Sequence, residues 1–562
     1  MDLTPRNLVR WLFDRASGPR SAFVPRWIFL RALAGIYFSA FLALFFQIKG
    51  LIGPNGILPA PTYLDAVRQN VGSMRFWYAP TLFWFSSSSH AMMVVVWIGL
   101  IASILAFLNL WPRLCFFLCF VCFLSFVTAA GDFSAYQSDG MLLEAGFLAL
   151  FFCPRGIWPG LGLTSPPARA SVFLLLFEWF RIYFESGLVK LFSGDPQWRH
   201  LTAMDEYYQN GPLPTWIGYY VEHLPHWFQV ATAGGTLVME LGIVWMLFLP
   251  RRVRIICFCI VTPWEIGVIL TANYAFLNYL VLFLGFLLLD DRSLRSWIPG
   301  RFRHDLETTV PAESVTVAEE RLSILTTPEW ETKYPSEASR ESGAGGRTRN
   351  FRDLLRHLRA VGIAVTAVLL SWIGYATVAE LLRMPWPDFP LLTFPVTALE
   401  PFRIANQYGL FAVMTRGRYE IEFQGSNDGQ TWTPYLFRHK PQALNEAPGI
   451  YAPYQPRFDW NLWFASLTDF QNAEIVPLTE EHLLQGDADV ISLFKEDPFP
   501  KAPPKYVRAM LWQYWFTTLD EKHDTGNWWR RELIGLYAPI LTRGPDGKFV
   551  VVQWPTPLPE HD

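Results

Sequence analysis

Residues 170–192 read ASVFLLLFEWFRIYFESGLVKLF, an apolar run that carries charged side chains in its interior. About 20 predominantly apolar residues are enough for a helix to cross a bilayer. Ionisable side chains at bilayer depth are costly, so they are functional candidates unless they neutralise one another. This segment therefore predicts a membrane protein and marks a position at which its site can be sought.

Further apolar windows flank this run, at 27–48, 90–110, 112–130, 139–153, 229–249, 253–271, 273–290 and 358–383. Only 17% of the chain is charged, against roughly 25% in an average soluble protein. We therefore expect a polytopic α-helical membrane protein with about nine spans. The weakest of them is MLLEAGFLALFFC, which is short and contains Glu144; we expect it to cross fully rather than re-enter, because a re-entrant segment would spoil the charge bias of the loops.

Loop charge predicts the orientation, since cytoplasmic loops carry an excess of Lys and Arg. Residues 1–26 hold five arginines and no apolar core, so we expect a cytoplasmic N-terminus ahead of an eight-span domain at 27–299. Residues 300–357 are rich in charge, Ser, Thr and Gly, which predicts a disordered cytoplasmic linker before a ninth span at 358–383. Residues 384–562 then lie outside.

The segment after the last span predicts a β-containing, α+β domain. In RYEIEFQ, residues 418–424, apolar and polar side chains alternate as in a half-buried strand. Asp428-Gly429 supplies a hairpin turn, and TWTPYLFR, residues 431–438, supplies a return strand. KYVRAMLWQYWFTT (505–518) and NWWRRELIGLY (527–537) are expected to be helices.

Charged residues of the fifth span form the first candidate site. Glu178, Arg181 and Glu185 fall on one helix face and can pair there, whereas Lys190 lies on another face near the outer end, without a partner on its own helix. One interpretation is that the three neutralise one another and Lys190 extends to the interface. Others are that Lys190 acts as a general base, or contacts a substrate or partner. The remaining intramembrane acids are expected to join helices: Glu144, Glu240 and Glu265.

Two further clusters lie outside the spans. His223 and His226 in VEHLPHW form a weak metal signal, because zinc needs three or four converging ligands, and we expect interfacial histidines instead. In the last domain Arg457 and Asp459 stand among indoles, which predicts a structural lock in which Asp459 pairs with Arg457 or a backbone donor. The indoles are those of Trp460 and Trp463.

Several common classes of protein find no support in the sequence. The chain contains no phosphate-binding loop, dinucleotide fingerprint, serine nucleophile elbow or HExxH motif, so we expect neither a cofactor nor a metal. The net charge of −3 predicts no nucleic-acid partner. All six cysteines fall in apolar runs, which argues against a disulfide framework.

Four ordered segments resemble motifs of the lipase maturation factor family. They are FQIKGLIGPNGILPA (46–60), SDGMLLEAGFLAL (138–150), SGLVKLFSGDPQWRHLTAMDEYYQNGPLP (186–214) and YAPYQPRFDWNLWFASL (451–467). The third places Asp195, Trp198, Tyr207 and Tyr208 in the outer loop, where animal members tend to read HYETQ and this chain reads YYQNG at 207–211.

The resemblance implies a multipass protein that, in animals, resides in the endoplasmic reticulum and assists the folding of secreted dimeric lipases. We therefore expect a membrane-anchored folding factor whose partners are the bilayer and secreted or membrane clients. No Asn-x-Ser/Thr sequon occurs and the chain ends in PEHD, so a bacterial cytoplasmic membrane fits better than the reticulum membrane expected of a eukaryotic protein.

A more distant likeness supplies the alternative. The segment SGLVKL, followed by Trp198, is similar to the membrane domain of vitamin K-dependent γ-carboxylase, in which a lysine is the catalytic base. Lys190 is the matching position. The alternative function is thus an integral membrane enzyme acting on a quinone-like or lipid substrate, and an internal pocket lined by Lys190 would favour it over a filled bundle.

Overall fold

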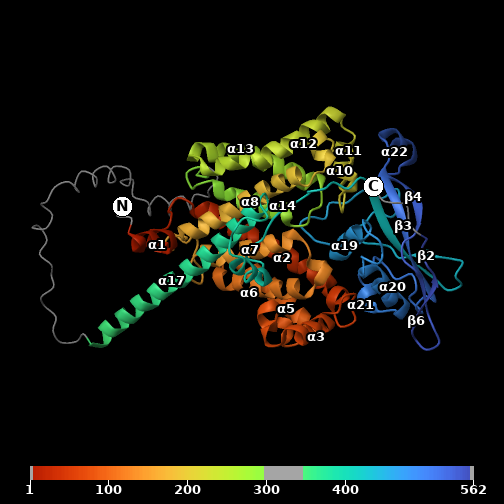
Figure 1. Ribbon diagram of the computed structural model, residues 1–562, viewed down its shortest axis with the longest axis horizontal. Helices are drawn as coiled ribbons and strands as arrows, with labels where there is room; N and C mark the ends of the chain where they lie inside the picture. The colour runs from red at the N-terminus through yellow and green to blue at the C-terminus, as the bar shows by residue number, and fades with distance from the viewer. Residues whose placement is uncertain (1–3, 296–345, 557–562) are drawn as a thin grey trace, which may run out of the picture.

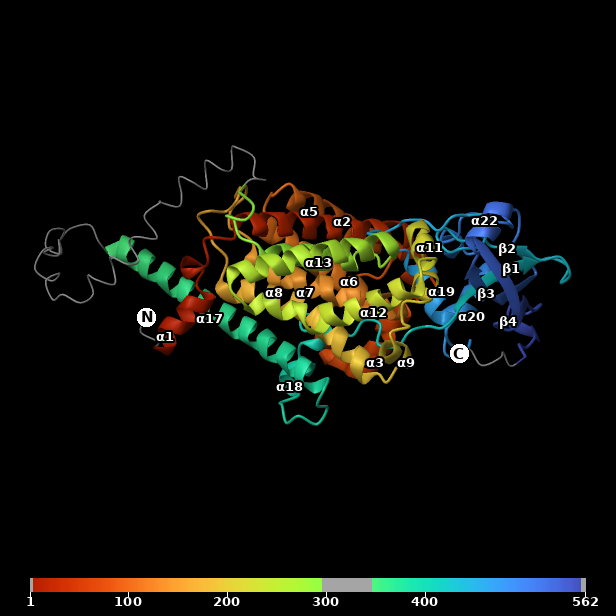
Figure 2. The same cartoon turned by 90° about the horizontal axis from the view of Figure 1, so that it is seen from above.

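The chain forms a helical bundle that carries a β-sheet domain on one end (Figure 1). The computed structural model describes residues 4–295 and 346–556. Helix α1 (Pro5–Phe13) and the start of α17 (Gly346–Arg383) lie at the opposite end of the bundle from the sheet, in both views (Figures 1 and 2). The two ends are called below the α1 end and the sheet end.

Every apolar window falls on a helix of the bundle. These helices are α2 (Phe23–Ile52), α5 (Ser89–Phe107), α6 (Pro112–Ala129), α7 (Gln137–Phe152), α8 (Arg169–Phe192), α12 (His226–Leu241) with η5 (Ile243–Phe248), α13 (Arg251–Thr271), α14 (Leu277–Gly285) with η6 (Phe286–Leu288), and α17. Their long axes run roughly together in Figure 2, and α2, α6 and α7 bury most of their side chains in the common core.

Fewer helices than expected meet the requirements for crossing a membrane. Within the described ranges, six helices are long and apolar enough to cross a bilayer, namely α2, α5, α6, α12 with η5, α13 and α17. Helices α7 and α14 are shorter, and α8 has the length but carries four charged residues beyond its first turn. The structure therefore establishes a multi-pass helical membrane protein with a C-terminal domain, whereas nine spans are not confirmed.

Part of the predicted linker is helical. Most of residues 300–357 lie outside the described part of the chain, but α17 already begins at Gly346 and continues to Arg383 without a break. The apolar part of this helix that is long enough to span a membrane is His357–Arg383, close to the expected span at 358–383. This helix packs against α1 and α8.

Short helices fill the connections. Before and within the bundle they are η1 (Arg15–Ser17), α3 (Ala60–Val71), η2 (Gly72–Met74), α4 (Arg75–Tyr78), η3 (Leu82–Trp84), η4 (Gly131–Ser134), α9 (Pro196–His200), α10 (Tyr207–Asn210) and α11 (Trp216–Glu222). After α17 follow α18 (Phe394–Thr397), η9 (Glu400–Phe402), α19 (Arg457–Ala465), α20 (Ile475–Gln485), α21 (Ala488–Ile491) and α22 (Leu519–Thr525).

The C-terminal domain is built on an antiparallel sheet in the order β2-β1-β3-β5-β6, with β4 also paired to β3. Its strands are β1 (Arg418–Ser426), β2 (Thr433–Pro434), β3 (Tyr506–Phe516), β4 (Trp529–Leu536), β5 (Ile540–Arg543) and β6 (Phe549–Gln553). The hairpin is confirmed, since Gln424 pairs with Pro434, although the return strand is only two residues long. The two helices expected at 505–518 and 527–537 are wrong: these segments are β3 and β4.

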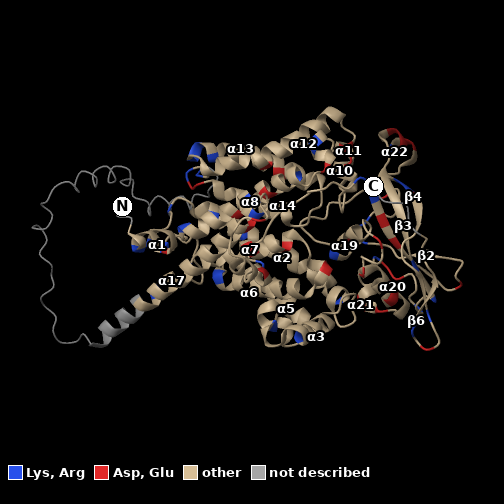
Figure 3. Cartoon of the chain, viewed as in Figure 1, with Lys and Arg blue, Asp and Glu red and all other residues tan. Residues whose placement is uncertain are grey.

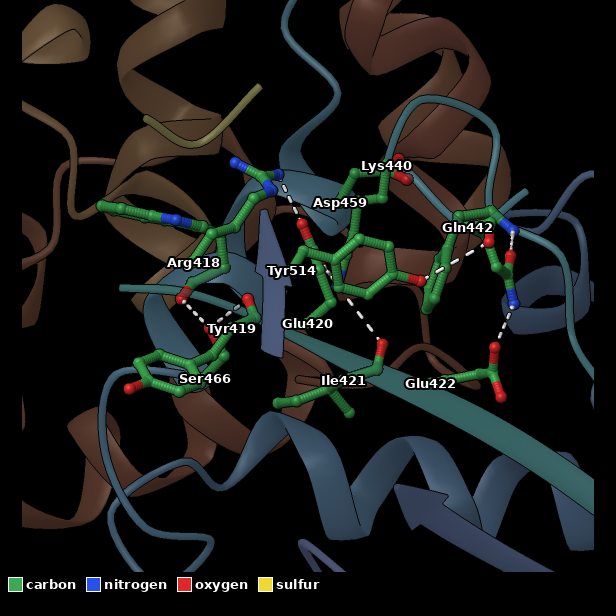
Figure 4. Close-up of polar contacts among 12 residues, drawn as sticks. Arg418, Tyr419, Glu420, Ile421, Glu422, Lys440, Gln442, Asp459, Ser466 and Tyr514 are labelled. Atoms are coloured by element: carbon green, nitrogen blue, oxygen red, sulfur yellow. Dashed lines mark hydrogen bonds and ion pairs between the residues drawn. The ribbon is translucent and has the colours of Figure 1, made fainter. Parts of the chain in front are cut away.

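Strand β1 is buried on both faces rather than on one. Its polar face meets a loop that supplies partners (Figure 4): Glu420 contacts Arg418 and lies 2.8 Å from Lys440 Nζ, and Glu422 accepts from Gln442 at 3.2 Å. Buried charges persist only when they are paired and hydrogen-bonded. The alternating residues of β1 therefore face two buried layers, one polar and one apolar, and neither face of the strand is exposed to water.

Candidate functional site

An irregular segment at residues 404–415, called here the strap, joins the two parts of the molecule. It leaves the bundle after η9 and runs into β1 at Arg418. Most of the charged and polar residues singled out in the bundle and the outer loop contact this strap, several of them through its backbone.

The first group is the ionic cluster of α7 and α8. Arg181 contacts Glu144 across the two helices, and its Nη1 donates to the Asn406 carbonyl at 2.6 Å. Glu144 also accepts from the Asn406 amide at 3.1 Å and from the Tyr408 hydroxyl at 2.9 Å. The Tyr408 amide donates to Glu185 at 2.6 Å. The cluster thus holds the strap inside the bundle.

The expected pairing along one face of α8 is wrong in part. Arg181 lies 4.0 Å from Glu185, but its closest carboxylate belongs to Glu144 on α7. Glu178 is fully buried and forms no ion pair with Arg181 or any other cation in the described ranges. Helical periodicity identifies neighbours on one helix, whereas packing against α7 and the strap decides which of them pair.

Lys190 holds the next part of the strap. Its Nζ lies 2.8 Å from both carboxylate oxygens of Glu240 on α12, and it donates to the Leu410 carbonyl at 3.0 Å and to Ser186 O at 3.3 Å. The Lys190 side chain is 1% exposed. The expectation that it extends to the interface is therefore wrong, because Glu240 and a strap carbonyl neutralise and satisfy the ammonium within the bundle.

A cavity of about 410 Å³ adjoins this ion pair, between α8, α12, α13 and α14. Its wall is mostly apolar and aromatic, with the Lys190–Glu240 pair and Glu265 as its charged members. Glu265 accepts a hydrogen bond from the Tyr183 hydroxyl. The internal pocket that would favour the enzyme alternative is therefore present and is lined by Lys190, whose amine also contacts three acceptor groups, those of Glu240, Leu410 and Ser186.

Outer-loop residues hold the end of the strap. Asp195 accepts from the Met414 amide at 2.7 Å, and the Trp198 indole donates to the Phe411 carbonyl at 2.9 Å. Tyr207 packs edge-on against Phe411, with ring centroids 5.9 Å apart. Tyr208 is buried beside Trp198 in the same small core.

The outer loop also meets the sheet domain directly. The Tyr208 amide donates to Glu222 at 3.1 Å, and burial raises the pKa of the Glu222 carboxyl well above its usual range. His223 contacts the Tyr219 and Thr517 carbonyls at 2.7 and 3.0 Å, whereas His226 pairs with Asp205 at 2.9 Å. The two histidines therefore have separate partners. Within the described ranges, no group of three or more His, Cys, Asp or Glu residues could hold a metal ion.

Arg457 fastens the sheet domain to the bundle at a second point. Its guanidinium donates to both oxygens of Asp139 at 2.7 and 2.8 Å and to the Phe133 carbonyl at 2.7 Å. Asp459 instead contacts His439, with 3.2 Å to Nδ1 and 3.4 Å to the amide. The Arg457–Asp459 pair does not form, because residues two apart on a helix do not share a face: Arg457 meets Asp139 of α7, and Asp459 takes the other expected partner, a backbone donor, in the His439 amide. Trp460 packs against Tyr136 of the bundle, and Trp463 against Phe464.

Several residues that contact the charged side chains of the bundle could not be singled out from the sequence. Asn406, Tyr408 and Leu410 bind through backbone groups in an irregular segment, which no periodicity marks. Asp139 appears in a quoted motif, but nothing nearby in sequence indicates a buried arginine 318 residues away.

Taken together, the apolar helices and the attached sheet domain define a class: a polytopic membrane protein that carries a folded domain at one end of its bundle. Residues 24–296 match the family model of the lipase maturation factor transmembrane domain, and residues 404–539 match that of the lipase maturation factor C-terminal domain. The chain belongs to the lipase maturation factor family.

Named relatives are similar over most of their length. Lipase maturation factor 2 of Gallus gallus is 32% identical over 92% of this chain and 82% of that protein. Lipase maturation factor 1 of Bos taurus is 30% identical over 95% of this chain and 92% of that protein. Lipase maturation factor 2 of Homo sapiens is 30% identical over 93% of this chain and 83% of that protein. No solved structure matches the chain. The resemblance inferred from the four motifs is confirmed, whereas the carboxylase alternative gains no support from these matches.

Proposed function

We propose that this chain is a membrane-anchored maturation factor that holds unfolded segments of secreted or membrane client proteins, lipases among them, while they fold. The observation that carries the proposal is an apolar strand edge, on a domain attached to a membrane bundle, that pairs with no further strand among the residues the structure describes. Family membership supports the general role, and the geometry of the sheet supports the mode of contact.

Strand β6 is the terminal strand of the sheet, beside β5. Val550 and Val552 are 46% and 53% exposed, and Trp554, which follows the strand, is 64% exposed. Edge strands of folded proteins are usually protected by charge or proline, because an open edge pairs with other chains. An extended apolar segment of an unfolded client can add to such an edge through main-chain hydrogen bonds.

The contacts of Lys190 support a positional role rather than catalysis. A general base needs an unprotonated nitrogen with a free lone pair. The Lys190 amine is instead surrounded by the Glu240 carboxylate, the Leu410 carbonyl and the Ser186 carbonyl. We therefore assign Lys190 to the attachment of the strap, and through the strap to the position of the client-binding sheet.

The positions of the apolar helices and of the charged residues bear on the topology. All nine apolar windows coincide with helices, and Figure 3 shows Lys and Arg on α1 and on the nearby end of α13, with others on α3 and in the sheet domain, while most of the bundle is uncharged. We propose nine spans, with the α1 end cytoplasmic and the sheet domain outside a bacterial cytoplasmic membrane. In a eukaryotic cell the corresponding side is the lumen of the endoplasmic reticulum.

The experiment uses the purified full chain in lipid nanodiscs and a chemically unfolded secreted lipase, whose regained activity is measured after dilution. The double variant Val550→Lys with Val552→Lys places charge on the open edge, where both side chains are exposed and folding is spared. Leu519→Lys is the matched control, since Leu519 is an equally exposed apolar residue of the same domain on α22.

We expect the wild type and Leu519→Lys to raise the lipase yield several-fold over empty nanodiscs, and the double variant to lose most of that gain. Equal yields from the double variant and the control would overturn the edge as the client site. No gain from the wild type would overturn the maturation function itself.

A further inference from the structure

A groove on the lipid-facing side of the bundle lies at the α1 end, between the start of α6 and the end of α7. Its volume is about 620 Å³, and it is lined by two arginines, Arg113 and Arg155, and by apolar side chains. Leu114 and Phe117, which share a face of α6, are 51% and 48% exposed. The groove thus combines a cationic end with an apolar wall that faces the bilayer.

A third arginine adjoins the cationic end of the groove. Arg15, which follows α1, donates to the Cys153 carbonyl at 2.6 Å, and Arg113 reaches the same carbonyl at 3.4 Å. Burial, and then the nearby positive charges of Arg113 and Arg155, lower the pKa of Arg15 to about 9. No Asp or Glu in the described ranges forms an ion pair with any of these three arginines.

A second observation concerns Arg113 itself. Its Nε is buried and donates to no acceptor in the described part of the chain, although the side chain lines the groove. A guanidinium group that no carboxylate neutralises is suited to phosphate, which accepts two or more of its N–H bonds at once. Trp111, exposed by 49% at the rim, is of the type that lies at headgroup level.

We propose that this groove binds one anionic glycerophospholipid from the leaflet at the α1 end of the bundle. The phosphate lies between Arg113 and Arg155, and an acyl chain follows Leu114 and Phe117 along α6. The negative charge of the lipid offsets the repulsion among the three arginines. Its acyl chain covers the exposed apolar side chains of the groove. The site is independent of the client-binding edge at the other end of the molecule.

The test measures lipid retention by native mass spectrometry of the full chain, released from micelles that contain phosphatidylglycerol or phosphatidylcholine of the same acyl chains. The variant is Arg113→Gln with Arg155→Gln. The control is Arg20→Gln with Arg252→Gln, two exposed arginines of the α1 end that lie outside the groove lining and carry the same total charge change. The single variant Arg155→Gln changes only an exposed residue, so it is the variant least expected to disturb folding.

We expect the wild type and the control to retain phosphatidylglycerol, the groove variant to bind it at least tenfold more weakly, and Arg155→Gln to lie between them. Equal retention by the groove variant and the control would overturn the proposal, as would equal retention of phosphatidylcholine. Displacement of the lipid by millimolar glycerol 3-phosphate would also overturn it, because a free phosphate would then suffice without the acyl chains.

Discussion

Arg457 and Asp139 form a two-bond ion pair, at 2.7 and 2.8 Å, in which both side chains are completely buried. Arg457 is the first residue of α19 in the sheet domain, whereas Asp139 lies in the first turn of α7 in the bundle. The pair therefore joins the two parts of the molecule at a point shielded from water, where the loss of one partner leaves an uncompensated charge.

The change Arg457→Gln should destabilise the junction strongly, since removing one member of a buried pair costs roughly 3–5 kcal/mol. We expect a clear fall in the melting temperature of the full chain in detergent and faster proteolysis between residues 384 and 418. Arg416→Gln, at an exposed position beside the strap, is the control. A melting temperature equal to that of the control would show that the pair does not fasten the domain.

Asp459 should matter less, because its partner is a histidine of the same domain. Asp459→Ala removes a carboxylate that contacts the His439 ring and amide, for which a loss of roughly 1–3 kcal/mol is typical. We expect a small drop in melting temperature relative to Asp520→Ala, an exposed acid of α22. Unchanged stability together with lost client binding would instead place Asp459 on a functional surface.

Glu480 should make the free energy of unfolding depend on pH. It is fully buried on α20 of the sheet domain, and burial raises the pKa of its carboxyl well above the usual value. The folded state keeps the proton while the unfolded chain loses it above about pH 4.3, so this group makes stability fall as pH rises, by up to about 1.4 kcal/mol per unit.

Glu480→Gln should therefore stabilise the chain at pH 8 more than at pH 5, measured as the difference in melting temperature from the wild type. Glu496→Gln, at an exposed position, should show no such trend. A gain that is equal at both pH values would contradict the buried, protonated acid.

The topology can be read with reporter fusions. Alkaline phosphatase fused after Trp386 should be active, since this position follows the last span on the outside, and a fusion near Ser339 should be inactive. An inactive fusion after Trp386 together with an active one near Ser339 would mean that the span count is wrong by one.

Long apolar runs and a short hairpin were predictable from the sequence because both depend on local pattern. Strands β3 and β4 were not. Ala509, Met510, Leu511 and Gln513 all favour helices, but pairing with β1 across the domain overrides that preference. In β4 the register shift near Gly535 disturbs the alternation that would have marked a strand.

The charged residues of the bundle can be singled out from the sequence, but their contacts cannot. Charge at bilayer depth identified Glu144, Arg181 and Lys190, but Lys190 meets Glu240 from 50 residues away. Periodicity cannot supply such a pairing, because it depends on how helices pack. The contacts of the strap carbonyls cannot be predicted from the sequence for a further reason: every residue has a carbonyl group, so residue type does not show which of them is used.

We propose that Lys190 positions the strap and does not act as a base. The most direct measurement is the yield of active secreted lipase in cells that express Lys190→Arg or Lys190→Ala at matched levels. Arginine can donate to Glu240 and to the Leu410 carbonyl, yet it stays protonated at any working pH. We predict that Lys190→Arg keeps most of the wild-type yield while Lys190→Ala loses it. A loss in the arginine variant equal to that of alanine, with intact folding and membrane insertion, would contradict the account.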